Sequence, residues 1–199
     1  MKMEYTITKT KRNSIILCSS FLILHVLVTR LLFLINTPST INTSVHLIRN
    51  VIYLIPFGYL MFVFYSYFKH YRLKILQISI LLIFTMEVFL KSTLFRNILE
   101  STIIKTFFLI ANAIWIIAAI ILIIFLFKSE IKKIQGIAFI QMYAISIILI
   151  YVLATTIPFY VHHDNILKTQ LLVGLTNAIP FVFTLIFATK LKIKNKTSS

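Results

Sequence analysis

The feature that most constrains this chain is a series of apolar runs, each about twenty residues long. An α-helix rises about 1.5 Å per residue, so about twenty apolar residues cross the roughly 30 Å hydrocarbon core of a bilayer. Soluble domains are about 45–50% apolar, whereas 59% of these 199 residues are hydrophobic. The sequence therefore predicts an all-α, polytopic membrane protein that forms a single membrane domain over residues 1–199.

Six transmembrane helices are predicted from these runs. The first run is too long for the apolar region of a signal peptide and lacks a small-x-small cleavage site, so we expect it to be retained as a helix. Residues 36–49 are polar and rich in Thr, Ser and Asn, which is typical of a loop. The expected helices cover residues 14–35, 50–68, 75–89, 106–127, 137–157 and 169–189.

Basic residues are distributed unequally between the two sides of this scheme. The formal net charge is +15, but the charges occupy loops and tails between apolar runs, which favours a membrane partner over nucleic acid. Fourteen of the twenty Lys and Arg residues fall in the two tails and in the loops 69–74 and 128–133. By the positive-inside rule these segments are cytoplasmic, so both termini are expected inside, where basic loops contact anionic lipid headgroups.

Two residues that disfavour helices stand close together in the second run. Pro56 lacks a backbone N–H and clashes with the carbonyl four residues earlier, and Gly58 has no side chain beside that point. The chain has only four prolines and three glycines. We therefore expect a break in the helix here. Asn50, Pro56 and Gly58 are expected to form one functional face together with Glu87 and Arg96.

Glu87 is the only carboxylate inside a predicted span. A charge in the hydrocarbon costs about 2.5–3.5 kcal/mol on insertion scales, so it is normally paired, protonated or beside a water-filled cavity. Lys91 follows one turn later at i+4, Arg96 lies just beyond the helix, and Arg30 lies at a comparable depth in the first span. Glu87 therefore belongs either to a structural ion pair or to a functional site at the outer leaflet.

Other candidate sites are weaker. Cys18 and His25 are seven residues apart on one helix face, and a Cys–His pair can form a nucleophile; two unrelated core residues is the interpretation we favour. The loop sequence His162-His163-Asp164 lacks further metal ligands nearby, so we expect no metal site there. A single cysteine excludes an intrachain disulfide and a Cys-based zinc site. We expect no cofactor.

Amide side chains inside the apolar runs are expected to connect helices. Asn112, Gln141 and Asn177 lie within or at the ends of predicted spans, where amides commonly hydrogen-bond between helices. Pro180 is expected to kink the last helix, with Gly174 and Asn177 softening the break.

The second run resembles a known family. Residues 50–60 read NVIYLIPFGYL and are similar to the VanZ-like motif, in which an Asn opens a helix reading roughly N-I-x-x-F-I-P-x-G-x-L-L. The family continues with a short basic loop, a helix ending in an intramembrane Glu, and an Arg. The loop 69–74, Glu87 and Arg96 stand at these places. The resemblance covers roughly residues 45–105 and implies a VanZ-like part over 14–127, followed by an additional helical pair over 137–189.

The sequence also departs from the family pattern. Leu90 stands where the family usually has a Gln one turn after the Glu, and the acidic segment that follows is reduced to Glu100. The resemblance implies an integral membrane protein of the bacterial plasma membrane that affects cell-envelope properties or tolerance of glycopeptide antibiotics such as teicoplanin. An envelope precursor or the glycopeptide would then be its partner.

Two other functions remain open from the sequence. Pro56 with Gly58, and Pro180 with Gly174, are typical of discontinuous helices that line transport sites. This pattern is compatible with the membrane subunit of a small-molecule or peptide exporter, or with an immunity protein. An intramembrane peptidase built on Cys18 is the third alternative. We expect no covalent catalysis.

Overall fold

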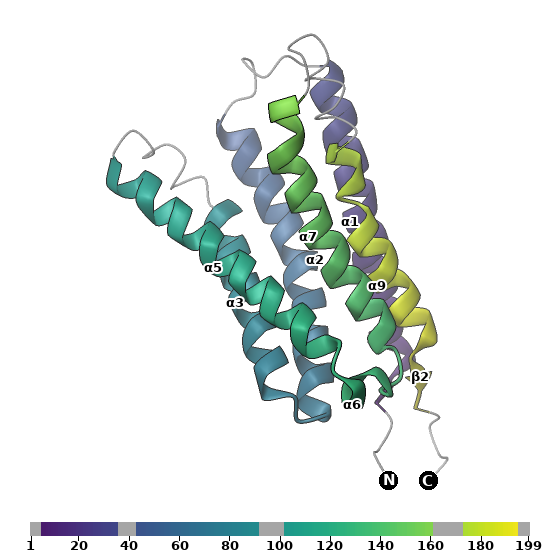
Figure 1. The fold of residues 1–199 in the computed structure, drawn as a ribbon. Helices are drawn as coiled ribbons and strands as arrows, with labels where there is room; N and C mark the ends of the chain where they lie inside the picture. Colours follow the sequence, from purple (N-terminus) through teal and green to yellow (C-terminus); the bar gives the residue numbers. More distant parts are fainter. Residues whose placement is uncertain (1–4, 36–42, 92–101, 161–172, 195–199) are drawn as a thin grey trace. The chain divides into compact units, whose positions relative to one another are not determined.

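The computed structural model describes residues 5–35, 43–91, 102–160 and 173–194, and these are almost entirely helical. The elements (Figure 1) are β1 (Thr6–Ile7), α1 (Lys9–Ile35), α2 (Thr43–His70), α3 (Lys74–Lys91), α5 (Thr102–Leu126), α6 (Ser129–Lys132), α7 (Ile137–Tyr160), α9 (Ile179–Lys190) and β2 (Lys192–Ile193). The all-α class predicted from the apolar runs is confirmed.

Five helices in the described part of the chain are long and apolar enough to cross a membrane. They are Lys9–Leu31 of α1, Ile48–His70 of α2, Thr106–Leu126 of α5, Ile137–Thr156 of α7, and Val173–Lys190, which includes α9. The chain is therefore of the multi-pass membrane type. The remaining predicted span corresponds to α3, an 18-residue helix with Lys74 and Lys91 at its ends and Glu87 in its last turns.

Several helix boundaries differ from the sequence prediction. α1 begins at Lys9 rather than residue 14, and α5 begins at Thr102 rather than residue 106. The loop expected over residues 36–49 is shorter, because α2 already begins at Thr43. Although residues 43–49 are largely polar, they are helical because they form the first turns of the same helix as the apolar run that follows. The C-terminal end of α7 also differs: α7 extends through Pro158 to Tyr160, whereas a loop was expected from Pro158 onward.

The expected break at Pro56 is wrong. α2 runs without interruption from Thr43 to His70, with Pro56 inside it. Proline removes one intrahelical hydrogen bond, the one to the carbonyl of Ile52, but the bonds on either side still hold the helix together. The helix containing Pro180 does break, as expected: a helical turn at Val173–Thr176 is followed by a turn at Asn177–Ala178 before α9 begins.

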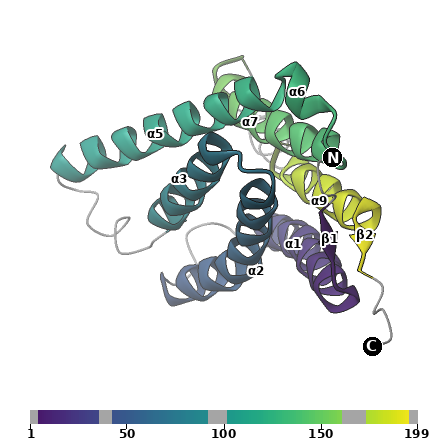
Figure 2. The same ribbon diagram turned by 90° about the horizontal axis from the view of Figure 1, so that it is seen from below.

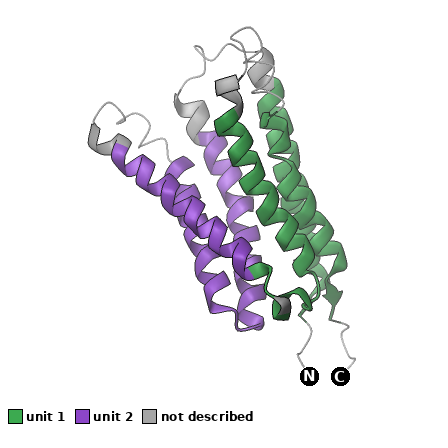
Figure 3. Ribbon diagram, viewed as in Figure 1, with its two compact units in different colours: residues 1–31, 126–199 green, residues 32–125 purple. Residues whose placement is uncertain are grey.

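The chain divides into two compact units, coloured separately in Figure 3: residues 1–31 with 126–199, and residues 32–125. We call them unit 1 and unit 2. In unit 1, α9 packs along α7, and Figure 2 shows α9 lying between α7 and α1. β1 pairs in parallel with β2, with Thr6 opposite Lys192 and Ile7 opposite Ile193. The two ends of unit 1 are thus joined at one end of its helices.

In unit 2, α2 and α3 pack together as a helical hairpin. The turn between them contains Arg72, whose φ is 57°, and Leu73 donates its N–H to the carbonyl of Phe68 at 2.9 Å. A left-handed residue followed by such a bond is the usual way for a helix to end and its chain to reverse. The reversal brings the last turn of α3 beside the first half of α2.

Candidate functional site

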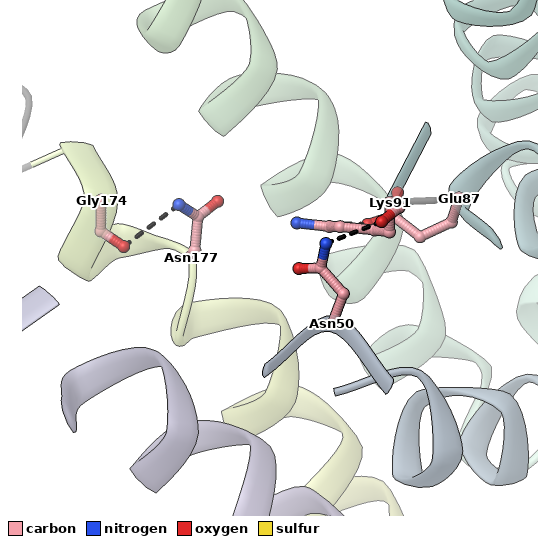
Figure 4. Close-up of polar contacts among 5 residues, drawn as sticks. All are labelled: Asn50, Glu87, Lys91, Gly174 and Asn177. Carbon is pink, nitrogen blue, oxygen red and sulfur yellow. Dashed lines mark hydrogen bonds and ion pairs between the residues drawn. The ribbon is translucent and has the colours of Figure 1, made fainter. Parts of the chain in front are cut away.

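Asn50 and Glu87, the two polar residues of the motif, both lie at the C-terminal end of α3 and both contact Lys91. Nδ2 of Asn50, on α2, donates a hydrogen bond to the backbone carbonyl of Lys91 at 2.7 Å (Figure 4). Lys91 is the last residue of α3, and the last carbonyls of a helix have no donor within the helix. Asn50 therefore caps α3 from the neighbouring helix, which gives a physical reason for an amide at this position.

Lys91 connects this cap to Glu87. Its Nζ lies 3.9 Å from Oε1 of Glu87, so Lys91 is the one of the three candidate partners that the described residues show paired with Glu87. The same Nζ lies 5.0 Å from the ring centroid of Tyr53, within range of a cation–π contact. The Glu87 side chain is 16% exposed and that of Lys91 42%. Asn50, Tyr53, Glu87 and Lys91 form what we call the hairpin cluster.

Aromatic packing next to the hairpin cluster holds α2 against α3. The ring of Phe57 stacks on Tyr53 at 5.4 Å and approaches Phe84 of α3 at 6.2 Å between centroids. A Cβ added at Gly58 would lie 3.1 Å from two ring atoms of Phe84. Gly58 thus allows close packing of α2 against Phe84 of α3, and α2 has no break at this position.

The other residues expected at this face have different positions. Pro56 is buried, but it lies about 120° around α2 from Asn50 at 100° per residue, so the two do not share a face. Arg96 lies outside the described residues. Tyr53 was missed from the sequence, although its i+3 spacing from Asn50 places it on the same side of the helix.

Arg30, a candidate partner of Glu87, belongs to unit 1 and lies against Gly174 there. A Cβ added at Gly174 would come within 2.6 Å of both Cδ and Cζ of Arg30. Gly174 is buried and Arg30 is partly exposed. The glycine therefore leaves the space that the arginine side chain occupies.

The three amides behave differently from one another. Gln141 of α7 donates to the carbonyl of Leu126, the last residue of α5, at 2.7 Å, as expected for an amide connecting helices. Asn112 instead donates to Phe108 of its own helix at 2.9 Å, and Asn177 to Gly174 at 3.1 Å. For these two the expected contact between helices is not what the described bonds show, because a carbonyl of the preceding turn lies within reach.

A buried contact between hydroxyls was not foreseen. Ser19 of α1 and Thr184 of α9 lie 2.7 Å apart and are both buried. Thr184 already donates its proton to the carbonyl of Phe181 at 2.8 Å, so Ser19 donates to Thr184. Serine and threonine are frequent in membrane helices and commonly bond to their own backbone, which leaves no sequence signal for a pair 165 residues apart.

The structure does not support a nucleophilic pair of Cys18 and His25. Cys18 and His25 are separated by about 10 Å along the axis of α1, beyond the roughly 3 Å over which a nucleophile and its base interact, and His25 stacks on Phe21 at 6.3 Å. His162, His163 and Asp164 lie outside the described residues. Among the residues that are described, no three His, Cys, Asp or Glu side chains come together as metal ligands do.

The hairpin cluster offers non-covalent chemistry. It presents a partly exposed ammonium group with three donors, a carboxylate beside it and the face of a tyrosine ring. Such a set can bind a polar or zwitterionic group at the end of the hairpin. Its members are held on two helices by the Asn50 cap and the Phe57–Phe84 packing, so their relative positions are set by the α2–α3 hairpin.

Comparison with known proteins adds no relative. No protein-family model, no curated protein and no solved structure matches the chain.

Proposed function

We propose that this chain is a multi-pass protein of the bacterial plasma membrane that affects cell-envelope properties or tolerance of glycopeptide antibiotics, as its resemblance to the VanZ-like family implies. One observation carries the proposal: Asn50 and Glu87, two polar residues of the motif 37 positions apart, are joined through Lys91 at the end of one hairpin. Residues that only face lipid would not be expected to form polar contacts with the same side chain at a helix end.

Six membrane crossings with both termini in the cytoplasm fit this proposal. β1 directly precedes α1 and β2 directly follows α9, and the two strands are paired. The chain would then enter and leave the bilayer at the same face, which requires an even number of crossings. Five helices meet the criteria of length and apolarity, and α3, about 27 Å long, supplies the sixth crossing as the return of the α2–α3 hairpin.

The proposed action is binding rather than catalysis. The hairpin cluster holds an amide, a phenol, a carboxylate and an ammonium group, and its carboxylate is already engaged by Lys91. These groups suit recognition of a polar envelope precursor, or of the glycopeptide itself, at the outer face.

The test is teicoplanin susceptibility in a strain that depends on this chain. Glu87→Gln keeps the shape of the side chain and removes its charge, so we expect it to reproduce most of the change in the inhibitory concentration that deletion causes. Glu130→Gln is the matched control, because Glu130 is an exposed carboxylate on α6 outside the hairpin cluster. Membrane abundance is measured in parallel by immunoblot.

Three outcomes are informative. A deletion that changes susceptibility, together with Glu87→Gln that does not at normal abundance, removes the hairpin cluster from the function. Equal effects of Glu87→Gln and Glu130→Gln indicate a general charge effect and also count against it. A deletion without any phenotype under glycopeptide stress contradicts the proposed function itself.

A transport function is the alternative, and one observation favours it. The last span is discontinuous at Asn177–Ala178, where the carbonyl of Gly174 accepts bonds from Asn177 instead of continuing a regular helix. The second discontinuity that motivated this alternative, at Pro56, is absent from α2. Efflux of a labelled peptide or antibiotic from vesicles containing the chain, abolished by Gly174→Leu, would favour an exporter subunit over the envelope function.

A further inference from the structure

A second site lies in unit 1, where Arg30 of α1 rests on the turn that precedes α9. Arg30 is 21 residues after Lys9, so it stands about 30 Å along α1 from the end at which β1 and β2 pair. That distance matches the hydrocarbon thickness of a bilayer. The guanidinium group therefore lies near the membrane face opposite the paired strands.

Three carbonyls of the turn next to Arg30 each accept at least one hydrogen bond from within the turn, and the carbonyl of Gly174 accepts two. The carbonyl of Gly174 accepts from both the backbone N–H and Nδ2 of Asn177, at 3.3 and 3.1 Å (Figure 4). The carbonyl of Val173 accepts from the Thr176 hydroxyl at 2.6 Å, and that of Leu175 from Ala178 at 3.1 Å. A carbonyl oxygen has two lone pairs, so the oxygen of Gly174 has no capacity left for Arg30.

No carboxylate of unit 1 is placed to neutralise Arg30, as far as the described residues go. The only acidic side chain among the described residues of unit 1 is that of Glu130 on α6. α6 leads into Gln135, which donates to the carbonyl of Lys190 at the end of α9 next to β2. Glu130 thus belongs to the opposite end of the unit. Within the described ranges, no hydrogen bond or ion pair of Arg30 is found.

Arginine in a membrane span is costly, and it is usually paired with an opposite charge or backbone carbonyls or directed to the interface, where lipid phosphates lie. Its planar fork of five donors matches phosphate oxygens in two-point contacts. Gly174 leaves the space that the guanidinium occupies, because a Cβ there would lie 2.6 Å from Cδ and Cζ of Arg30, so any larger residue would displace the arginine side chain. We propose that Arg30, seated on Gly174, binds a phosphate group at the membrane face opposite the chain termini. The site shares no residue with the hairpin cluster.

The test uses the full chain purified in a neutral detergent at about physiological ionic strength, where weak surface attraction is screened. Short-chain phosphatidylglycerol, phosphatidylcholine and inorganic phosphate are each titrated by calorimetry. We expect Arg30→Gln to weaken binding of the phosphate probe about tenfold, the loss typical of a charge-assisted contact. Gly174→Ala should weaken it similarly while leaving Arg30 in the chain, and Lys132→Gln, an exposed cation on α6, should change it less than twofold.

The three probes distinguish the source of the phosphate. Binding of phosphatidylglycerol that depends on Arg30, without competition by inorganic phosphate, indicates a lipid headgroup, whereas competition indicates a soluble phosphate compound. Binding of every probe by Arg30→Gln and Gly174→Ala at wild-type strength overturns the proposal. Should Arg30→Gln fail to fold, Arg30→Lys and Gly174→Ala decide the question, since a lysine keeps the charge but loses the fork.

One intramolecular explanation is tested in the same way. If Asp164→Asn lowers the melting temperature as much as Arg30→Gln does, while Arg30→Gln leaves phosphatidylglycerol binding intact, Arg30 pairs within the chain and the phosphate site is contradicted. An unchanged melting temperature in Asp164→Asn, with weakened binding in Arg30→Gln, supports the phosphate site.

Discussion

The two units solve the same problem, holding apolar helices together, in different ways. In unit 2 the α2–α3 hairpin is closed by contacts between neighbours in sequence: a glycine under an aromatic ring and an amide cap at the helix end. In unit 1 the contacts join distant parts of the chain, with Ser19 bonded to Thr184 and β1 paired with β2. The local contacts are made by residue types that are rare in this chain, such as glycine. The distant contacts are made by serine, threonine and short strands, which nothing in the sequence singles out.

The largest effect is expected where unit 2 depends on close approach. Gly58→Leu places a side chain where even a Cβ is 3.1 Å from Phe84, so we expect the hairpin to separate, with a loss of about 3 kcal/mol or more in the free energy of unfolding. Gly58→Ala should cost less, because the end of the Phe84 ring can shift slightly. Both are measured by unfolding of the reconstituted protein in an SDS titration.

Ala113→Leu is the matched control for Gly58→Leu, since Ala113 is exposed on α5 of the same unit. It should change stability by less than about 0.5 kcal/mol. Equal losses at both positions would show that added bulk, rather than the Gly58–Phe84 approach, is what the unit does not tolerate.

A smaller effect is expected at the helix cap. Asn50→Ala leaves the last carbonyl of α3 without its donor, and we expect a loss of about 1 kcal/mol. Asn112→Ala removes an amide that bonds only to the preceding turn of its own helix in the described contacts, so its cost should be near zero. The same SDS titration compares the two. Similar losses at the two positions would contradict a special role for the Asn50–Lys91 bond.

The smallest effect is expected at the hydroxyl pair of unit 1. Thr184→Val keeps the shape of the side chain but removes the acceptor of Ser19, and Ser19 can turn to a carbonyl of its own helix. Hydrogen bonds between membrane helices average about 0.6 kcal/mol in double-mutant cycles. We expect a coupling of that size between Thr184→Val and Ser19→Ala. A coupling of zero would mean that α1 and α9 are held by packing alone.

The sequence predicted the helices well and the contacts unevenly. Apolar runs of about twenty residues and their basic connections were sufficient for the all-α class and for the approximate positions of the long helices that the structure describes. Lys91 was one of three candidate partners of Glu87, named for its i+4 spacing, and it is the one that pairs with Glu87 in the described residues. The break predicted at Pro56 is absent, because proline removes one hydrogen bond of a helix while the bonds on either side persist. Gly58 was selected for a helix break that is absent from α2, and what it provides is space for Phe84. Gly174 lies at the expected discontinuity before Pro180 and in addition leaves space for Arg30.

Other features left no trace that a single sequence can show. Ser19 and Thr184 are two of many hydroxyls in apolar runs, and nothing in their local sequence identifies them as partners. The pairing of β1 with β2 involves two residues on each side, far fewer than periodicity can detect. The Asn50 cap was missed as a bond although Asn50 itself was selected, because the identity of its acceptor depends on how the α2–α3 turn sets the two helices in register.

The paired strands also determine when each unit can be completed during synthesis. Thr6–Ile7 leave the ribosome long before Lys192–Ile193, by roughly 10–40 s at a rate of 5–20 residues per second. The α2–α3 hairpin can close as soon as its turn has formed, because its contacts lie within residues 50–91. Unit 1 has to keep its first strand unpaired until its last strand is made. If synthesis stops before Lys192, the α2–α3 hairpin can be folded while β1 has no partner strand. We expect such a truncated chain to be degraded faster than the full chain.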